Sequence, residues 1–199
     1  MPTYQAYGLT LQSDVTLPGV DPGHGEADVI VRARRLTSEV LGERPASGQW
    51  IYGTYQDKAN VLVADGREIS VDVRKPIPEG DFVGLVLGEL MATLLRQRGL
   101  LVIHACAVAD AEGNALAFAG ESGWGKSTLA EYFCQHGFSL VTDDVIAIDI
   151  QSDGAFAIPS YSQIRLREDA AAHLVEEASL LVPIDRNGFK QAREDHALA

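Results

Sequence analysis

Eight consecutive residues of this 199-residue chain have the types and spacing of a phosphate-binding loop. They read GESGWGKS and satisfy the pattern G-x-x-x-x-G-K-[ST] without a mismatch. Glycines let the backbone turn so that successive N–H groups point at phosphate oxygens, and a following helix adds the positive end of its dipole. The residues expected to form this nucleotide site are Gly120, Glu121, Ser122, Gly123, Trp124, Gly125, Lys126, Ser127 and Thr128.

Two side chains of the loop would contact charged groups of the bound nucleotide and its metal ion. Lys126 would reach the β- and γ-phosphates, and the Ser127 hydroxyl would bind Mg²⁺. The loop follows the apolar run ALAFA and opens the helical run STLAEYFCQHG. That context favours phosphate binding over the alternative of a glycine-rich structural turn. Trp124 is expected to point out of the loop, where it would shield the nucleotide, contact the acceptor, or be an incidental aromatic residue.

Two adjacent aspartates, Asp143 and Asp144, lie in the strand-like run FSLVTDDVIAIDI. A carboxylate that faces a phosphate loop can bind Mg²⁺, and phosphorylation of a hydroxyl group also needs a proton acceptor. Two interpretations stay open: both aspartates only position Mg²⁺, or they divide the two tasks. Because strand side chains alternate, a division would put Asp144 nearer the metal and Asp143 nearer the acceptor hydroxyl and His104, or the reverse.

The elements around these residues fall into two expected domains. Residues 1–80 contain short strand-like runs, which predict a small antiparallel β-rich subdomain with a hairpin turn at Asp65-Gly66. Residues 81–199 would form the domain that holds the loop. It begins with a helix predicted over Asp81 to Arg98, which Gly99 would end.

Two apolar runs precede the loop, LLVIHACAV and ALAFA, and only a short polar link separates them. The link AEGN is too short for a crossover helix, so the two strands should pair antiparallel. A doubly wound nucleotide-binding domain would instead connect these strands through a helix. The sequence therefore predicts an α/β domain with a mixed sheet.

Composition excludes some classes of partner. Lysine and arginine total 16 against 28 acidic residues, a net charge of −12, which argues against a nucleic acid held by phosphate neutralisation. No run approaches the roughly 20 apolar residues of a membrane span, and the N-terminus lacks a charged leader followed by an apolar run. Cys106 and Cys134 are expected to be reduced, buried thiols. We therefore expect a cytoplasmic protein.

Together, GESGWGKST, the helix ending in HG, LVTDD, and HACAV on the strand before the loop resemble the catalytic domain of HPr kinase/phosphorylase and its smaller serine-kinase relatives. Some of those relatives act in peptide-tailoring clusters, including lasso-peptide pathways. The resemblance covers roughly residues 100–166. It implies a fold related to phosphoenolpyruvate carboxykinase, ATP and Mg²⁺ as cofactors, and a serine hydroxyl as acceptor.

The resemblance also implies site residues. His104, Asp143 and Asp144 would be catalytic, with Ser127 and Asp144 on the metal. Without the resemblance, His104 could instead be a core histidine whose ring nitrogens are hydrogen-bonded. His136 ends a helix, where a cation suits the dipole, and is expected to have no catalytic role.

The sequence departs from the family pattern at both ends. The N-terminal zone does not match the sensing domain of the bifunctional enzyme. Downstream, IPSYSQIRLRED is only loosely similar, and Arg165 and Arg167 could contact phosphate or simply be exposed. Glu168 and Asp169 could bind metal or begin a helix. Relatives continue beyond the point that matches Ala199, so the acceptor site is expected to be incomplete here or completed by another subunit of an oligomer.

The resulting expectation is an ATP- and Mg²⁺-dependent kinase that phosphorylates a serine on a peptide or small protein. Two alternatives stay open: a nucleotide-binding regulator without turnover, and a kinase for a small molecule such as free serine.

Overall fold

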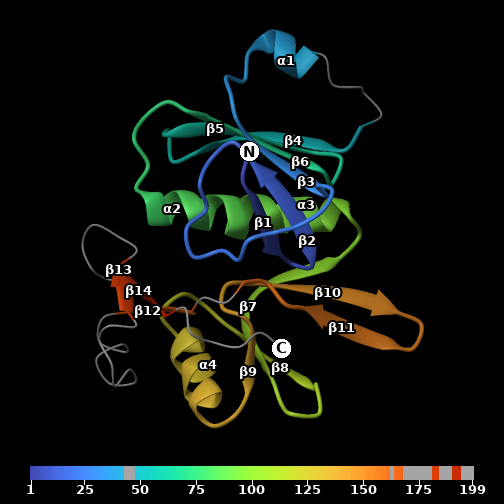
Figure 1. The fold of residues 1–199 in the computed structure, drawn as a ribbon, viewed down its shortest axis with the longest axis vertical. Coiled ribbons are helices and arrows are strands. Elements are labelled where there is room, and N and C mark those ends of the chain that lie inside the picture. The colour runs from blue at the N-terminus through green and yellow to red at the C-terminus, as the bar shows by residue number, and fades with distance from the viewer. Residues whose placement is uncertain (43–47, 162–163, 168–180, 184–189, 194–199) are drawn as a thin grey trace. The chain divides into compact units, whose positions relative to one another are not determined.

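The computed structural model describes residues 1–42, 48–161, 164–167, 181–183 and 190–193, and it describes side chains up to residue 161. It is a mixed α/β protein with a six-stranded mixed sheet and a five-stranded antiparallel sheet (Figure 1). The chain forms two compact units. The first contains most of residues 1–100, and the second contains residues 6–8, 19–21 and those from 101 onward.

The six-stranded sheet belongs to the first unit and has the strand order β1-β2-β3-β6-β5-β4. The strands are β1 (Thr3–Ala6), β2 (Leu9–Ser13), β3 (Val29–Ala33), β4 (Trp50–Tyr55), β5 (Ala59–Ala64) and β6 (Glu68–Val73). Strand β3 runs parallel to both β2 and β6, so the prediction of a small antiparallel sheet is wrong. The segments that separate these strands, residues 14–28 and 34–67, are long enough for the chain to return in the same direction. A short helix, α1 (Ser38–Gly42), lies in the second of these segments.

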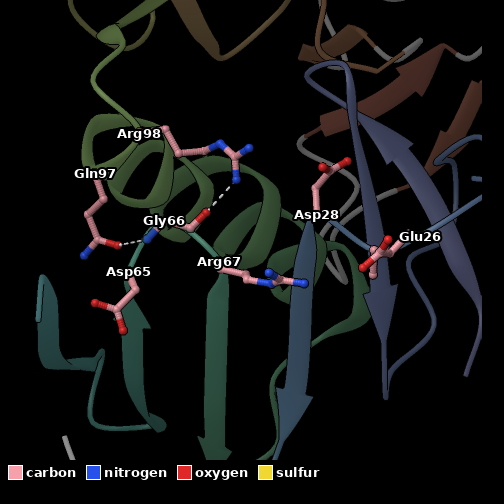
Figure 2. A pocket seen from close by; sticks show the side chains of 8 residues that line it. Glu26, Asp28, Asp65, Gly66, Arg67, Gln97 and Arg98 are labelled. Atoms are coloured by element: carbon pink, nitrogen blue, oxygen red, sulfur yellow. Dashed lines mark hydrogen bonds between the residues drawn. The ribbon is translucent and has the colours of Figure 1, made fainter. Parts of the chain in front are cut away.

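The hairpin predicted at Asp65-Gly66 is confirmed between β5 and β6, which pair antiparallel. Both turn residues, which are labelled in Figure 2, have positive φ angles, 56° at Asp65 and 61° at Gly66. The backbone N–H of Arg67 donates to the carbonyl of Ala64 at 3.0 Å and closes the turn. Two successive positive φ angles match the twist of the flanking strands, which is why Asp-Gly is favoured here.

A helical segment follows the sheet and consists of α2 (Glu79–Gly84), a π-helical turn η1 (Leu85–Leu90) and α3 (Met91–Gln97). It matches the helix predicted over Asp81 to Arg98, but the π-helical turn was not predicted. The N–H groups of Gly99 and Leu100 donate to the carbonyls of Arg96 and Leu95, and Gly99 has a φ of 89°. This pattern is a Schellman motif, in which glycine ends a helix. Helix α3 packs against β5 and β6, so the structure groups it with the first unit, whereas the predicted boundary after residue 80 assigns it to the second.

The five-stranded sheet belongs to the second unit, and all of its described strand pairs are antiparallel, so the mixed sheet predicted for the domain that holds the loop is wrong for these strands. Its strands are β7 (Leu101–Ala109), β8 (Ala115–Ala119), β9 (Ser139–Thr142), β10 (Val145–Gln151) and β11 (Gly154–Ile158). Strands β7 and β8 pair from Ala105↔Ala119 to Ala109↔Ala115, which confirms the predicted hairpin. Three further strands, β12 (Ile164–Arg167), β13 (Leu181–Pro183) and β14 (Lys190–Arg193), form a small sheet.

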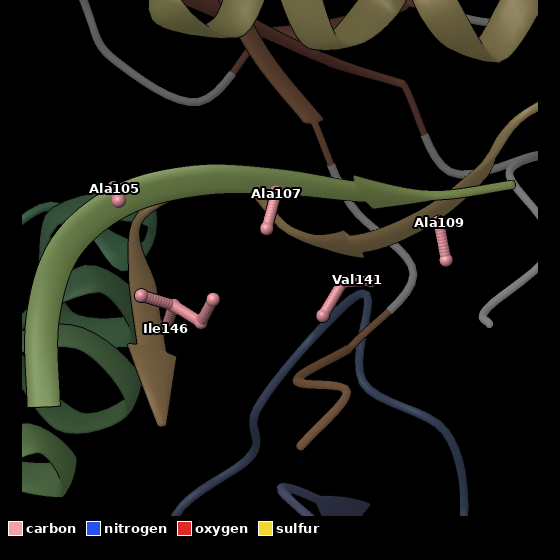
Figure 3. Packing of buried hydrophobic residues seen from close by; sticks show 5 residues of the cluster. All are labelled: Ala105, Ala107, Ala109, Val141 and Ile146. Atoms are coloured by element: carbon pink, nitrogen blue, oxygen red, sulfur yellow. The ribbon is translucent and has the colours of Figure 1, made fainter. Parts of the chain in front are cut away.

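Strand β7 is the centre of this unit's core, because each of its faces packs against a different set of apolar residues. On the side of helix α4 (Lys126–Gln135), the buried residues are Cys106, Val108, Ala130 and Leu140. On the opposite side they are Ala105, Ala107, Ala109, Val141 and Ile146 (Figure 3). This alternation is the strand period of two, and it directs Cys106 towards the helix that follows the glycine-rich loop. Within the described part of the chain, no helix is both long and apolar enough to cross a membrane.

Candidate functional site

The glycine-rich loop joins the end of β8 to the start of α4, as its sequence predicts. Gly123 and Gly125 have φ angles of 88° and 81°, a region that strongly favours glycine. The ammonium group of Lys126 donates to the carbonyls of Gly120, at 2.9 Å, and Glu121, at 3.1 Å. The lysine therefore folds back over the loop, and its ammonium group lies against two of the loop's carbonyl oxygens.

Trp124 points away from the loop, as expected, with 74% of its surface exposed. Its ring also lies against Gly120, where an added Cβ would come within 3.3 Å of a ring carbon. Glu121 and Ser122 are exposed as well. The outer surface of the loop is thus an aromatic ring beside polar side chains.

The run FSLVTDDVIAIDI is not one strand, because it breaks at the two aspartates. Strands β9 and β10 both pair with β7, on either side of the break. Their registers, Ala107↔Thr142 and His104↔Val145, place Cys106 across from Asp143. The hydroxyl of Thr142 donates to the carbonyl of Val145 at 2.8 Å. Such a local side-chain bond replaces strand pairing and lets the backbone turn.

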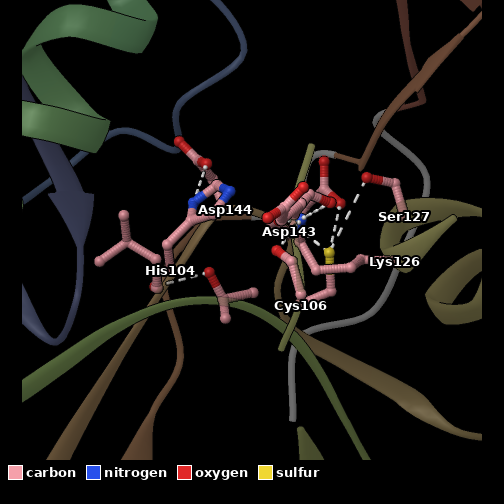
Figure 4. Close-up of polar contacts among 10 residues, drawn as sticks. His104, Cys106, Lys126, Ser127, Asp143 and Asp144 are labelled. Carbon is pink, nitrogen blue, oxygen red and sulfur yellow. Dashed lines mark hydrogen bonds and ion pairs between the residues drawn. The ribbon is translucent and has the colours of Figure 1, made fainter. Parts of the chain in front are cut away.

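Asp143 lies on the side of the break that faces the loop (Figure 4). It is nearly buried, with 9% of its surface exposed. The thiol of Cys106 donates to its backbone carbonyl at 2.8 Å and to its carboxylate Oδ1 at 3.1 Å. The same sulfur lies 3.8 Å from the hydroxyl oxygen of Ser127. One sulfur atom therefore links the carboxylate of Asp143 to the hydroxyl of the loop.

Asp144 lies on the other side of the break and pairs with His104. Its Oδ1 is 3.0 Å from the imidazole Nδ1. The His104 side chain is 58% exposed and that of Asp144 is 36% exposed, so solvent reaches both. His104 is therefore not a buried core histidine, and that alternative is wrong.

Of the two arrangements left open by the sequence, the first puts Asp144 nearer the metal, and the contacts in the structure correspond to the reverse. Asp143 shares a contact with Ser127, and Asp144 contacts His104. The aspartates do point in different directions, as predicted, but the cause is the break between β9 and β10 and not the alternation of side chains along one strand.

The thiol of Cys106 stays protonated. Burial raises its pKa far above the ordinary value, and the negative charge of Asp143 raises it further. A neutral thiol can donate its hydrogen to the carboxylate, whereas a thiolate would repel it. Cys106 is thus a hydrogen-bond donor in this site.

The residues on this side of the break fit a magnesium ion and the phosphates of a nucleotide. Mg²⁺ prefers hard oxygen ligands, and Ser127 and Asp143 offer a hydroxyl and a carboxylate linked through one sulfur. Lys126 and the N-terminus of the ten-residue helix α4 supply positive charge beside them.

For several other candidate residues, the structure describes only the backbone or nothing at all. Arg165 and Arg167 lie on β12, but their side chains are outside the description. Glu168, Asp169 and the helix expected after them lie outside the described residues. His136 contacts Tyr132 at the end of α4 and takes no part in the site.

Sequence reasoning identified Cys106 as a small buried residue and missed its contacts with Asp143 and Ser127. Its place two residues after His104 on a strand was visible, but the cross-strand register that sets it opposite Asp143 was not.

No protein-family model matches the sequence, and no curated protein matches it significantly.

Proposed function

We propose that this protein is an ATP- and Mg²⁺-dependent kinase that phosphorylates a serine hydroxyl on a peptide or small protein. The observation that carries the proposal is the division of the aspartate pair. Asp143 is linked to the phosphate-loop serine through Cys106, and Asp144 is paired with an exposed histidine. A kinase needs a carboxylate for the metal and a proton acceptor for the incoming alcohol, and these two positions suit the two tasks.

On the nucleotide side, Lys126 and the backbone N–H groups of the loop would bind the phosphates. Ser127 and Asp143 would hold Mg²⁺, which neutralises charge on the phosphate oxygens when it is bound. The structural support is local: the loop glycines have the required backbone angles, and the lysine already lies over the loop carbonyls.

On the acceptor side, Asp144 would accept the proton of the serine hydroxyl while the hydroxyl oxygen attacks the γ-phosphorus. A new phosphorus–oxygen bond forms to serine, the bond to the bridging oxygen breaks, and ADP leaves. His104 would orient the Asp144 carboxylate, since its Nδ1 lies 3.0 Å from Oδ1. The exposure of both side chains allows an acceptor from solvent to reach them. This exposed pair favours a kinase over a regulator, because nucleotide binding alone requires neither group.

A transfer assay with three acceptors tests the proposal. The protein is incubated with Mg²⁺ and ATP labelled at the γ-phosphate, together with a mixture of serine-containing peptides, the same peptides with alanine at the serine position, or free serine. We expect label on the serine peptides and none on the alanine peptides. Label on free serine alone would indicate a small-molecule kinase. Binding of ATP without transfer to any of these acceptors would favour the nucleotide-binding regulator.

A further inference from the structure

The buried thiol of Cys106 has no part in the reaction outlined above, yet it contacts both residues assigned to the metal. We propose that Cys106 is a positioning residue, which holds the carboxylate of Asp143 and the hydroxyl of Ser127 in the orientation that binds Mg²⁺. This inference rests on the proposed function, because it concerns the same nucleotide site.

The directions of the hydrogen bonds follow from the single proton of a thiol. That proton points at Asp143, whose backbone carbonyl is 2.8 Å from Sγ and whose Oδ1 is 3.1 Å away. If the thiol proton is directed at Asp143, the hydrogen in the 3.8 Å contact between Sγ and Ser127 Oγ comes from the serine hydroxyl. The serine therefore directs its hydrogen at the sulfur and leaves its oxygen lone pairs for another partner. A hydroxyl oxygen whose hydrogen points away can bind a cation through these lone pairs.

Packing fixes the sulfur in this place. Cys106 is fully buried in the cluster formed with Val108, Ala130 and Leu140, between β7 and α4. Strand pairing holds its backbone opposite Asp143. The thiol therefore connects two segments of the site, the break between β9 and β10 and the first turn of α4.

The contacts of the carboxylate with Cys106 also limit its rotation. Asp143 follows a strand that has just ended, so its backbone is not held by regular pairing on both sides. A donor that contacts both its backbone carbonyl and its Oδ1 restrains the residue at two points. Loss of that donor removes one restraint on the carboxylate, so more of its ordering would have to accompany metal binding, which weakens binding.

Substitutions at Cys106 separate positioning from packing. Cys106→Ala removes the donor and leaves a small cavity, whereas Cys106→Ser keeps a donor at nearly the same place. Cys106→Val retains apolar volume without a donor, and it provides the comparison with serine if the alanine variant does not fold. Cys134→Ala is the matched control, because Cys134 lies on α4 and packs at the edge of the same cluster.

The measurement is the Mg²⁺ concentration that gives half of the maximal thermal stabilisation by ATP. We expect Cys106→Ala and Cys106→Val to need about tenfold more Mg²⁺ than the wild type, the change expected when a hydrogen bond to a charged group is lost. Cys106→Ser should stay within about threefold of the wild type, and Cys134→Ala should not change the requirement.

Two results would overturn the inference in distinguishable ways. If the wild type responds to Mg²⁺ and ATP but the donor-free variants need no more Mg²⁺, Cys106 contributes packing only and the proposed function stands. If the wild type shows no Mg²⁺-dependent stabilisation by ATP, the proposed function fails, and this inference fails with it.

Discussion

The imidazole of His104 on β7 and the carboxylate of Asp144 in the break between β9 and β10 meet at 3.0 Å, with the histidine side chain 58% exposed. An exposed carboxylate with a histidine partner suits the role of proton acceptor proposed for Asp144, and the break between β9 and β10 is what turns Asp144 towards His104. The neighbouring Asp143 faces the glycine-rich loop instead. The local backbone thus separates two carboxylates that are adjacent in the sequence.

Asp144→Asn should lower the phosphotransfer rate by about 10² to 10⁴-fold and leave ATP binding unchanged, because it removes the proton acceptor and keeps the side-chain size. Rates and ATP affinity are measured on the same preparation. Asp149→Asn is the matched control, since Asp149 lies on β10 and bonds only Gln151 among the described side chains. A normal transfer rate in Asp144→Asn would remove the acceptor-side role.

Asp143→Asn should raise the Mg²⁺ concentration needed for ATP binding by about tenfold or more, because an amide is a much weaker magnesium ligand than a carboxylate. Titration of Mg²⁺ at fixed ATP, followed by thermal unfolding, measures the shift. If Asp143→Asn and Asp144→Asn both impair binding in the same way, the pair only positions Mg²⁺, and the interpretation with two tasks is wrong.

Nucleotide binding should change the fluorescence of Trp124, because its exposed ring lies against Gly120 at the edge of the loop. The chain has a second tryptophan, Trp50, on β4 of the other unit. ATP should therefore alter the emission of Trp50→Phe but not that of Trp124→Phe. An unchanged spectrum in Trp50→Phe at saturating ATP would contradict a nucleotide beside this ring.

Asp110 should make the turn between β7 and β8 sensitive to acid. Its carboxylate accepts hydrogen bonds from the backbone N–H groups of Glu112 and Asn114 and from the Asn114 amide. These bonds hold its pKa below the ordinary value of 3.8. A lowered folded-state pKa means that the stabilisation is fully present above pH 3.8 and is lost as the pH falls through the folded-state value.

The corresponding measurement compares the unfolding free energy of the wild type and Asp110→Asn as a function of pH. The wild type should be the more stable protein at neutral pH, and the difference should shrink in acid. A difference that does not depend on pH would mean that the charge of Asp110 contributes nothing to the turn.

Local signals predicted several elements correctly. The short link between β7 and β8 allowed only an antiparallel pair, and the Asp65-Gly66 turn and the helix stop at Gly99 followed from the backbone angles that glycine favours. Each of these features depends on residues that are close together in the sequence. Apolar spacing likewise identified the helical segment that ends at Gln97.

Features that depend on distant residues could not be predicted. The position of β3 between β2 and β6 is set by tertiary packing, since the apolar pattern of a strand does not state the direction of its neighbour. The contact between Cys106 and Asp143 depends on the cross-strand register, and the orientation of Asp144 depends on the Thr142 bond that spans the break. The types of the site residues were therefore visible in the sequence, but the division between the two aspartates was not.

The most direct test of the account is ATP-dependent thermal stabilisation of the wild type and of Lys126→Ala in the presence of Mg²⁺. Lys126 is the loop cation that would contact the phosphates, and its ammonium group now bonds the carbonyls of Gly120 and Glu121. The wild type should gain about 2.7 kcal/mol of stability at ATP concentrations about a hundredfold above its dissociation constant. At that ATP concentration Lys126→Ala should gain little, whereas the control Lys75→Ala should behave as the wild type. Equal stabilisation of Lys126→Ala and the wild type at saturating ATP, or no stabilisation of the wild type, would contradict the assignment of this loop as a nucleotide site.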